Sequence, residues 1–303
     1  MMDQHVTIEQ RVAQHYAQNN LERTILGALA ASGKDINKLT CDDLAPIDEF
    51  HTGGRMATVE FAEQLNLKSE MRILDLGCGI GGASRFIAGR YGCHVTGIDI
   101  TEEYVRTAQS LAGRVGLADR VTFQHASAVD LPFETQSFDG AYMMHVGMNI
   151  EDKTRLFSEV RRVLKNGSVF GIYDVLLTGL GDPKFPLPCA LTSDIAFIEG
   201  AGAYRRGLTA AGFEIEAERN RLDVAREFFR QEQARGAEGE GPPALGIHIL
   251  LKQEAPRILA NTMRQFESGV FAPVEFICRA REPSQSAHDR DPAGAHTNHG
   301  ATK

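Results

Sequence analysis

The segment from Met71 to Gly82 constrains this chain more than any other. It reads M-R-I-L-D-L-G-C-G-I-G-G, a short apolar run followed by four glycines within six residues. The apolar run indicates a buried strand, and the clustered glycines indicate a backbone that takes unusual dihedral angles and approaches a ligand closely. Small and apolar residues then recur at helical spacing. The pattern predicts a strand, a glycine loop and a helix N-terminus, which favours a ligand with negative charge or hydrogen-bond acceptors.

Two acidic residues narrow the choice of ligand. Asp99 ends the next predicted strand, 22 residues after Gly77, and this spacing suits bonds to ribose hydroxyls. Gly77, Gly79 and Gly82 also satisfy the dinucleotide fingerprint, but the carboxylate of Asp75 at the mouth of the loop would repel a pyrophosphate. S-adenosylmethionine has a ribose, an ammonium and a sulfonium but no phosphate, so it fits better. A tight strand–helix turn without any ligand is the simpler alternative.

Four motifs in this order resemble the class I S-adenosylmethionine-dependent methyltransferases. They are I-L-D-L-G-C-G-I-G-G, C-H-V-T-G-I-D-I-T, A-V-D-L-P-F and F-D-G-A-Y, and the resemblance runs from about Asp48 to about Asp223. More narrowly, the chain is similar to the small-molecule branch that includes sarcosine/dimethylglycine, phosphoethanolamine, tocopherol and ubiquinone-pathway methyltransferases. The resemblance implies a Rossmann-like, doubly wound α/β sheet that is mostly parallel, with an antiparallel last strand and helices on both faces.

The chain is expected to have three parts. Apolar residues at helical intervals predict a helix over Gln10–Leu29. The resemblance implies that Ala272–Ala280 is the antiparallel strand inserted between the fifth and sixth strands. The predicted parts are an N-terminal helical cap or lid (1–50), a methyltransferase domain (51–281) with an insertion at about 176–202, and a disordered tail (282–303). The insertion is rich in Pro and Gly, and we expect it to form part of the acceptor pocket.

The resemblance assigns roles around the cofactor. Gly77 and Gly79 would approach its methionine portion, Asp99 would hold the ribose, and Ser127 and Ala128 would border the adenine. Because the family often has Asp where this chain has Ser127, a hydroxyl or a backbone carbonyl would have to accept the adenine amine there. The expected cofactor-binding residues are Asp75, Gly77, Cys78, Gly79, Asp99, Ile100, Ser127, Ala128 and His145.

His145 and Tyr16 are the catalytic candidates. His145 follows the predicted fourth strand, Phe138–Met144, and side chains at the carboxyl ends of central parallel strands face the ligand crevice. It would orient or deprotonate the acceptor; the alternative is a histidine bonded to nearby backbone. Tyr16 would contact the substrate or simply pack on the core. His51 lies in a loop and is expected to be structural or solvated.

Methyl transfer from a sulfonium is an in-line displacement that depends mainly on positioning and on excluding water. The first predicted acceptor is a small-molecule amine nitrogen, and a carbon or oxygen of a quinone- or prenyl-type lipid is the alternative. A NAD(P)-dependent oxidoreductase would need a hydride-transfer set that the sequence does not show, and a non-catalytic cofactor-binding protein is the remaining class.

Composition limits the partners and the compartment. The net charge of −8 and pI of about 5.7 disfavour nucleic acid. Five scattered cysteines without a C-x-x-C pair indicate reduced thiols in the cytoplasm, and no metal site is expected. The chain lacks an apolar run of 18 residues, so no membrane span is expected, and its polar N-terminus does not resemble a signal peptide. A homodimer is left open.

Overall fold

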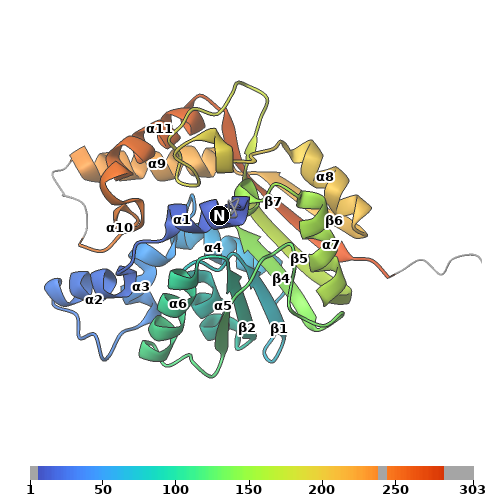
Figure 1. The fold of residues 1–303 in the computed structure, drawn as a ribbon, viewed down its shortest axis with the longest axis horizontal. Helices are drawn as coiled ribbons and strands as arrows, with labels where there is room; N and C mark the ends of the chain where they lie inside the picture. Colours follow the sequence, from blue (N-terminus) through green and yellow to red (C-terminus); the bar gives the residue numbers. More distant parts are fainter. Residues whose placement is uncertain (1–5, 238–243, 283–303) are drawn as a thin grey trace, which may run out of the picture.

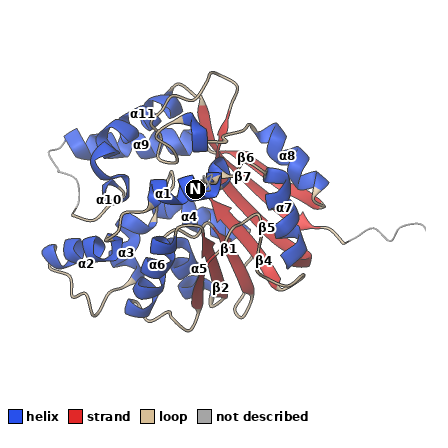
Figure 2. Cartoon of the chain, in the orientation of Figure 1, coloured by secondary structure: helices blue, strands red, loops and turns tan. Residues whose placement is uncertain are grey.

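The computed structural model describes residues 6–237 and 244–282. Its seven-stranded sheet has the order β3-β2-β1-β4-β5-β7-β6, and Figure 2 shows helices packed around it. Strands β1 to β5 pair in parallel, whereas β7 is antiparallel to both β5 and β6. The predicted fold class is therefore confirmed, including the late strand between the fifth and the sixth. The strands are β1 Arg72–Leu76, β2 His94–Asp99, β3 Val121–His125, β4 Phe138–Met144, β5 Leu164–Leu177, β6 Phe213–Asn220 and β7 Phe271–Ala280.

The helices belong to the two faces of the sheet and to a group formed by both ends of the chain. Figure 1 shows α1 to α3, in blue, beside α10, in orange. The helices are α1 Ile8–Tyr16, α2 Leu21–Ala31, α3 Cys41–Asp48, α4 Gly54–Gln64, α5 Gly82–Tyr91, α6 Glu102–Arg114, α7 Lys153–Val163, α8 Ala201–Ala210, α9 Leu222–Ala237, α10 His248–Leu251 and α11 Ala255–Glu267.

Alternating side chains of the central strand divide the core into two layers. Leu74 and Leu76 of β1 pack in a buried cluster that includes residues of α7 and α8. Ile73, which precedes Leu74 and lies on the opposite face of the strand, packs in a second cluster with residues of α4, α5 and α6. This alternation follows from the two-residue period of a strand, and the short apolar run of β1 fits a strand that is buried on both faces.

The first and last parts of the described chain share a third cluster. Leu21, Ile25 and Leu29 of α2 pack there with Leu245 and Leu250. The N-terminal helices therefore do not fold as an isolated unit, and the predicted boundary at residue 50 stays a prediction. The predicted tail lies outside the described residues from position 283 onward. Within the described part, no helix combines the length and the apolar character needed to cross a membrane.

The single helix predicted over Gln10–Leu29 is wrong, because two helices separated by a turn occupy this region. The carboxylate of Glu103, in the first turn of α6, accepts hydrogen bonds from the backbone N–H groups of Gln18, Asn19 and Leu21. Asn19 takes a left-handed conformation with φ of 68°. Helical periodicity continues through the turn in the sequence, but a distant carboxylate supplies the acceptors that break the helix.

Replacing Glu103 with Ala should therefore destabilise the protein by about 2 kcal/mol, because several backbone N–H groups lose a charged acceptor. Glu102 provides the matched control: it is exposed and pairs only with Arg106, so E102A should change the free energy of unfolding by less than about 0.5 kcal/mol. Urea unfolding followed by circular dichroism measures both effects. Equal effects of the two variants would contradict this account of the turn.

Candidate active site

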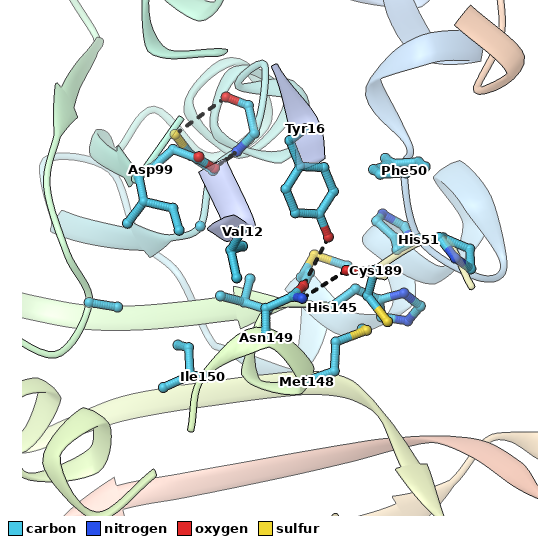
Figure 3. A pocket seen from close by; sticks show the side chains of 18 of the residues that line it. Val12, Tyr16, Phe50, His51, Asp99, His145, Met148, Asn149, Ile150 and Cys189 are labelled. Carbon is cyan, nitrogen blue, oxygen red and sulfur yellow. Dashed lines mark hydrogen bonds between the residues drawn. The ribbon is translucent and has the colours of Figure 1, made fainter. Parts of the chain in front are cut away.

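A cavity of about 350 Å³ opens where the parallel strands end. The glycine loop after β1, the residues after β2 and β4, helix α1 and the 176–202 segment all contribute to its wall. Figure 3 shows side chains from these separate elements converging on one space. The location is the one expected for ligand binding in an open parallel α/β sheet.

The glycine loop is fixed on one side and open on the other. The backbone N–H of Cys78 donates to the carbonyl of Ile98, 2.9 Å away, and this bond ties the loop to β2. Gly77 has φ of 67°, and a Cβ there would lie 2.5 Å from the side chain of Val146. Gly79 has φ of 54°, and a Cβ there would meet nothing within 4 Å. The loop backbone therefore presents a free surface to the cavity at Gly79.

Asp99 connects this loop to the next helix. Its Oδ2 accepts a hydrogen bond from the backbone N–H of Gly79 at 2.9 Å, and its Oδ1 accepts one from Thr101 at 2.8 Å. Burial raises the pKa of the Asp99 carboxyl, and these two hydrogen bonds oppose that rise. Asp99 and Ile100 both line the cavity. The acidic residue predicted from spacing thus lies against the glycine loop.

Asp75 sits beneath the loop and is fully buried. Its Oδ2 accepts a hydrogen bond from the hydroxyl of Ser84, 2.6 Å away, at the start of α5. Burial raises the pKa of this carboxyl to about 7, although the Ser84 bond opposes the rise. Asp75 also contributes to the cavity wall. It therefore anchors the helix that follows the loop while it faces the ligand space.

His145 follows β4 with φ of 56°, a left-handed conformation that few residues other than glycine adopt. Its backbone N–H donates to the carbonyl of Tyr173 at 2.7 Å, and its ring centroid lies 5.3 Å from that of Tyr173. The buried Nε2 has no hydrogen-bond partner among the described residues. Burial, and then the nearby His51, lower the pKa of His145 well below its usual value. Its imidazole is therefore neutral at pH 7.

Tyr16 joins three parts of the chain over the cavity. Its hydroxyl donates to Oδ1 of Asn149 at 2.9 Å, as Figure 3 shows. The amide of Asn149 donates in turn to the carbonyls of Cys189 and Ile195, at 2.9 and 3.0 Å. Tyr16 also packs against the ring of Phe50. Tyr16 therefore both lines the cavity and packs on a neighbouring ring. Through Asn149 it also connects α1 to the 176–202 segment.

Ser127 is hydrogen-bonded to helix α1 and to its own loop. Its hydroxyl donates to the carboxylate of Glu9 in α1 and accepts the backbone N–H of Val129. Ser127 is not part of the cavity lining, whereas its neighbours Ala126, Ala128 and Val129 are. Glu9 takes the hydroxyl proton and Val129 one acceptor position, so the oxygen keeps a second acceptor position, and the predicted border with the adenine stays a prediction.

The structure brings most of the candidates together and adds others. Glu9 and Asn149 were missed because neither lies in a recognisable local pattern, and only the packing of α1 on the sheet reveals them. The predicted residues that line the cavity are Tyr16, Asp75, Gly77, Cys78, Gly79, Asp99, Ile100, Ala128 and His145.

Charge in the lining is one-sided. Carboxyl groups are frequent, and no lysine or arginine is found among the described residues of the wall. The buried Arg85 compensates Asp48, and in a partly desolvated site the remaining carboxyl groups favour a cationic ligand and disfavour a phosphate. Across positions 6–237 and 244–282, no group of three or more His, Cys, Asp or Glu is placed to hold a metal ion. The carboxyl-bearing lining residues are Glu9, Asp48, Asp75, Asp99, Glu151 and Asp152.

The family comparison adds an independent observation. Residues 74–172, from β1 to the middle of β5, match the family model described as a methyltransferase domain. This part of the chain is similar to a methyltransferase domain. The match contains the glycine loop, Asp99 and His145, and it confirms the resemblance to class I methyltransferases that the motifs indicate.

Curated relatives match about half of the chain. A sterol 24-C-methyltransferase, ERG6B from Gibberella zeae, is 34% identical over 160 residues, which are 51% of this chain and 42% of the relative. The O-methyltransferase rstn1 from Aspergillus nomiae is 35% identical over 144 residues, 47% of this chain and 64% of the relative. The chain spans about half the length of the curated relatives it matches.

Solved structures extend the similarity in fold to almost the whole chain. The [4+2]-cyclase SpnF has a TM-score of 0.67 and 24% identity, covering 91% of this chain and 97% of its own. Phosphoethanolamine N-methyltransferase 2 from Haemonchus contortus, in complex with S-adenosyl-L-methionine, has a TM-score of 0.68 and 18% identity, covering 92% and 60%. At these identities the likeness shows the fold alone.

The buried carboxyl of Asp75 should make the free energy of unfolding depend on pH. Its carboxyl has a pKa of about 7 in the folded protein, against an ordinary value of 3.8. Between these values the folded state binds a proton that the unfolded chain has released, so the free energy of unfolding falls as the pH rises from about 4 to about 7. The slope from this group is at most about 1.4 kcal/mol per pH unit, and D75N should remove it.

Urea unfolding between pH 4 and pH 8 measures this contribution as the difference between the wild type and D75N. The exposed Asp119 supplies the control, because D119N should keep the wild-type dependence on pH. A constant difference between the wild type and D75N across this range would show that Asp75 is ionised in the folded protein.

Proposed function

We propose that this protein transfers a methyl group from S-adenosylmethionine to a small-molecule acceptor. The observation that carries the proposal is a glycine loop and Asp99 beside a cavity that is rich in carboxyl groups and whose described wall lacks lysine and arginine. A ribose finds a carboxylate there, and an ammonium or a sulfonium finds negative charge. A nucleotide with phosphates would find no cation, which argues against the oxidoreductase alternative.

The residues that would hold this cofactor follow from the wall of the cavity. The backbone at Gly77 and Gly79 would lie beside the methionine portion, where Gly79 leaves open space. Asp99 would accept the ribose hydroxyls, because a carboxylate has about four acceptor sites and two already serve Gly79 and Thr101. Ile100 and Ala128 would border the adenine. When bound, the cofactor supplies a methyl group on a positively charged sulfur.

The protein's own work is to position the acceptor and to exclude water. Tyr16 and Asn149 hold α1 and the 176–202 segment across the cavity. We therefore assign residues 1–50 as a cap and the 176–202 insertion as part of the acceptor wall. His145, neutral and with an unpartnered Nε2, would orient the acceptor. Aligned reactants in a closed site account for much of such a rate enhancement.

The acceptor we propose has an apolar body, no phosphate and an amine nitrogen as the reacting atom. The acidic lining suits an amine, and the apolar part of the wall suits a hydrophobic body. The same apolar wall favours the second candidate, a carbon or oxygen of a quinone- or prenyl-type molecule without a diphosphate. The apolar lining includes Val12, Ile100, Met148, Leu187 and Phe271.

We also propose the cytoplasm as the site of action. All five cysteines are free, and four of them are buried in the fold. A secreted protein of this kind would more often use its cysteines in disulfides.

Purified protein incubated with methyl-labelled S-adenosylmethionine and a fractionated metabolite extract tests the proposal. We expect label in the polar-amine fraction, or in the lipid fraction if the second candidate is right. Label in neither fraction, with the cofactor bound, would favour a non-catalytic binder or a different reaction on this fold, as the name of the cyclase SpnF illustrates.

Two variants test the assignment of roles. D99A should weaken cofactor binding at least tenfold in calorimetry, because the ribose loses its acceptor and the loop loses a bond. H145A should keep the cofactor affinity and lower turnover. D119A, a surface control, should change neither. The assignment fails if D99A binds the cofactor as tightly as the wild type does.

A further inference from the structure

His51, which the sequence suggested was structural or solvated, lies in the cavity wall beside His145. The two ring centroids are 5.9 Å apart, in an edge-on arrangement, and Figure 3 shows the two side chains next to each other. His51 follows α3 and comes just before the Gly53–Gly54 turn, so the fold brings it to His145 from 94 positions earlier in the sequence. Its side chain is only 6% exposed.

A buried carboxylate holds this histidine. Nε2 of His51 lies 2.9 Å from Oε2 of Glu49 and 2.9 Å from the hydroxyl oxygen of Thr58. The Thr58 hydroxyl itself donates to Oε2 of Glu49 at 2.6 Å. Arg55 forms an ion pair with the other oxygen of Glu49, at 2.6 Å. Burial raises the pKa of Glu49, but His51, Arg55 and Thr58 outweigh it, so the net pKa is lowered and the carboxylate stays charged.

These contacts fix the position of the proton on His51. The Thr58 hydroxyl donates its only proton to Glu49, so towards Nε2 of His51 it can only act as an acceptor. The Glu49 carboxylate has no proton and can also only accept. Nε2 must therefore carry a hydrogen, and the neutral ring keeps its lone pair on Nδ1. The carbonyl of Thr52 lies 3.5 Å from Nδ1, too far for a strong hydrogen bond, and it also receives the Tyr173 hydroxyl at 2.9 Å. Nδ1 is thus free to take a proton.

The two histidines differ in their ability to hold positive charge. An imidazolium at His51 would be stabilised by the adjacent carboxylate of Glu49, as a carboxylate stabilises the histidine in a hydrolytic triad. His145 has no carboxylate partner, and burial keeps it neutral. The titratable or charged groups that face His51 are Glu49 just after α3, Arg55 in α4, His145 after β4 and Tyr173 in β5.

We propose that His51, held by Glu49, is the general base of the site and that His145 orients the acceptor. This inference rests on the proposed methyl transfer and applies to an acceptor that must lose a proton from nitrogen or oxygen. The nucleophilic atom forms a bond to the methyl carbon as the carbon–sulfur bond breaks, and that bond's electron pair stays on sulfur. The acceptor's proton passes to Nδ1 of His51. The positive charge thus moves from sulfur to an imidazole that lies against Glu49.

The first experiment reads the tautomer directly and needs no acceptor. Long-range ¹H–¹⁵N correlation spectra of the full chain with ¹⁵N-labelled histidine should show His51 protonated on Nε2, with the H51Q spectrum supplying the assignment. E49Q should weaken this preference and shift the Nε2 proton resonance. The exposed pair His94–Glu70, whose atoms are 3.3 Å apart, is the matched control, because E70Q should leave the His51 signals unchanged. A proton on Nδ1 of wild-type His51 would overturn the proposal.

The second experiment uses labelled S-adenosylmethionine and the extract fraction that takes up label. H51Q should lower kcat by at least about 100-fold while the dissociation constant of the cofactor stays unchanged, because only proton removal is lost. E49Q should move the acid limb of the kcat/KM profile to lower pH, an effect that a merely structural role would not produce. H94Q and E70Q should behave as the wild type.

The outcomes distinguish a failure of the role of His51 from a failure of the proposed methyl transfer. Transfer by the wild type together with full kcat in H51Q would overturn the role of His51 and leave the methyltransferase assignment intact. No transfer by the wild type in any fraction would overturn the proposed function and, with it, the base. Intact cofactor binding by H51Q shows that a loss of turnover does not come from misfolding.

Discussion

A fully buried ion pair between Asp48 and Arg85 joins the N-terminal helices to the glycine loop. Nη2 of Arg85 lies 2.6 Å from Oδ1 of Asp48, and its Nη1 donates to the carbonyl of Ile80 at 2.6 Å. A Cβ on Gly82 would lie 2.4 Å from Cβ of Asp48, so α3 and α5 approach as closely as glycine permits. One guanidinium therefore sets the shape of the loop and the position of the last residue of α3.

This ion pair has two consequences for the site. Removing one partner would leave an uncompensated charge in the core, which makes such a pair hard to lose even where it adds little net stability. It also places the residues that follow α3, because Glu49 and His51 come directly after Asp48. The glycine loop that we assign to the cofactor and the proposed base His51 thus both depend on the Asp48–Arg85 ion pair.

The sequence predicts what is local and periodic. The strand, glycine loop and helix at Met71 to Gly82 and the spacing to Asp99 could be predicted, because each rests on a short pattern with a single physical meaning. The late antiparallel strand could be predicted only through the resemblance to a family. The position of His145 beside the cavity could be predicted because the carboxyl ends of parallel strands lie at the same edge of the sheet. Contacts between distant segments could not be predicted from the sequence. Examples are the bonds of Glu103 to the turn between α1 and α2 and the bond between Glu9 and Ser127. The position of the Glu49–His51 pair beside His145 also appears only in the tertiary structure.

The wall of the cavity is assembled from segments that are far apart in the order of synthesis. Val12 and Tyr16 belong to α1, the first described helix. Leu250, Phe266 and Phe271 belong to α10, α11 and β7, near the end of the described chain. The side chain of Gln18 also donates to the carbonyl of Leu250, and Lys252 donates to that of Ala17. A chain truncated after β5 would therefore lack one side of the pocket, and the segment after its first helix would lack these two hydrogen-bond partners.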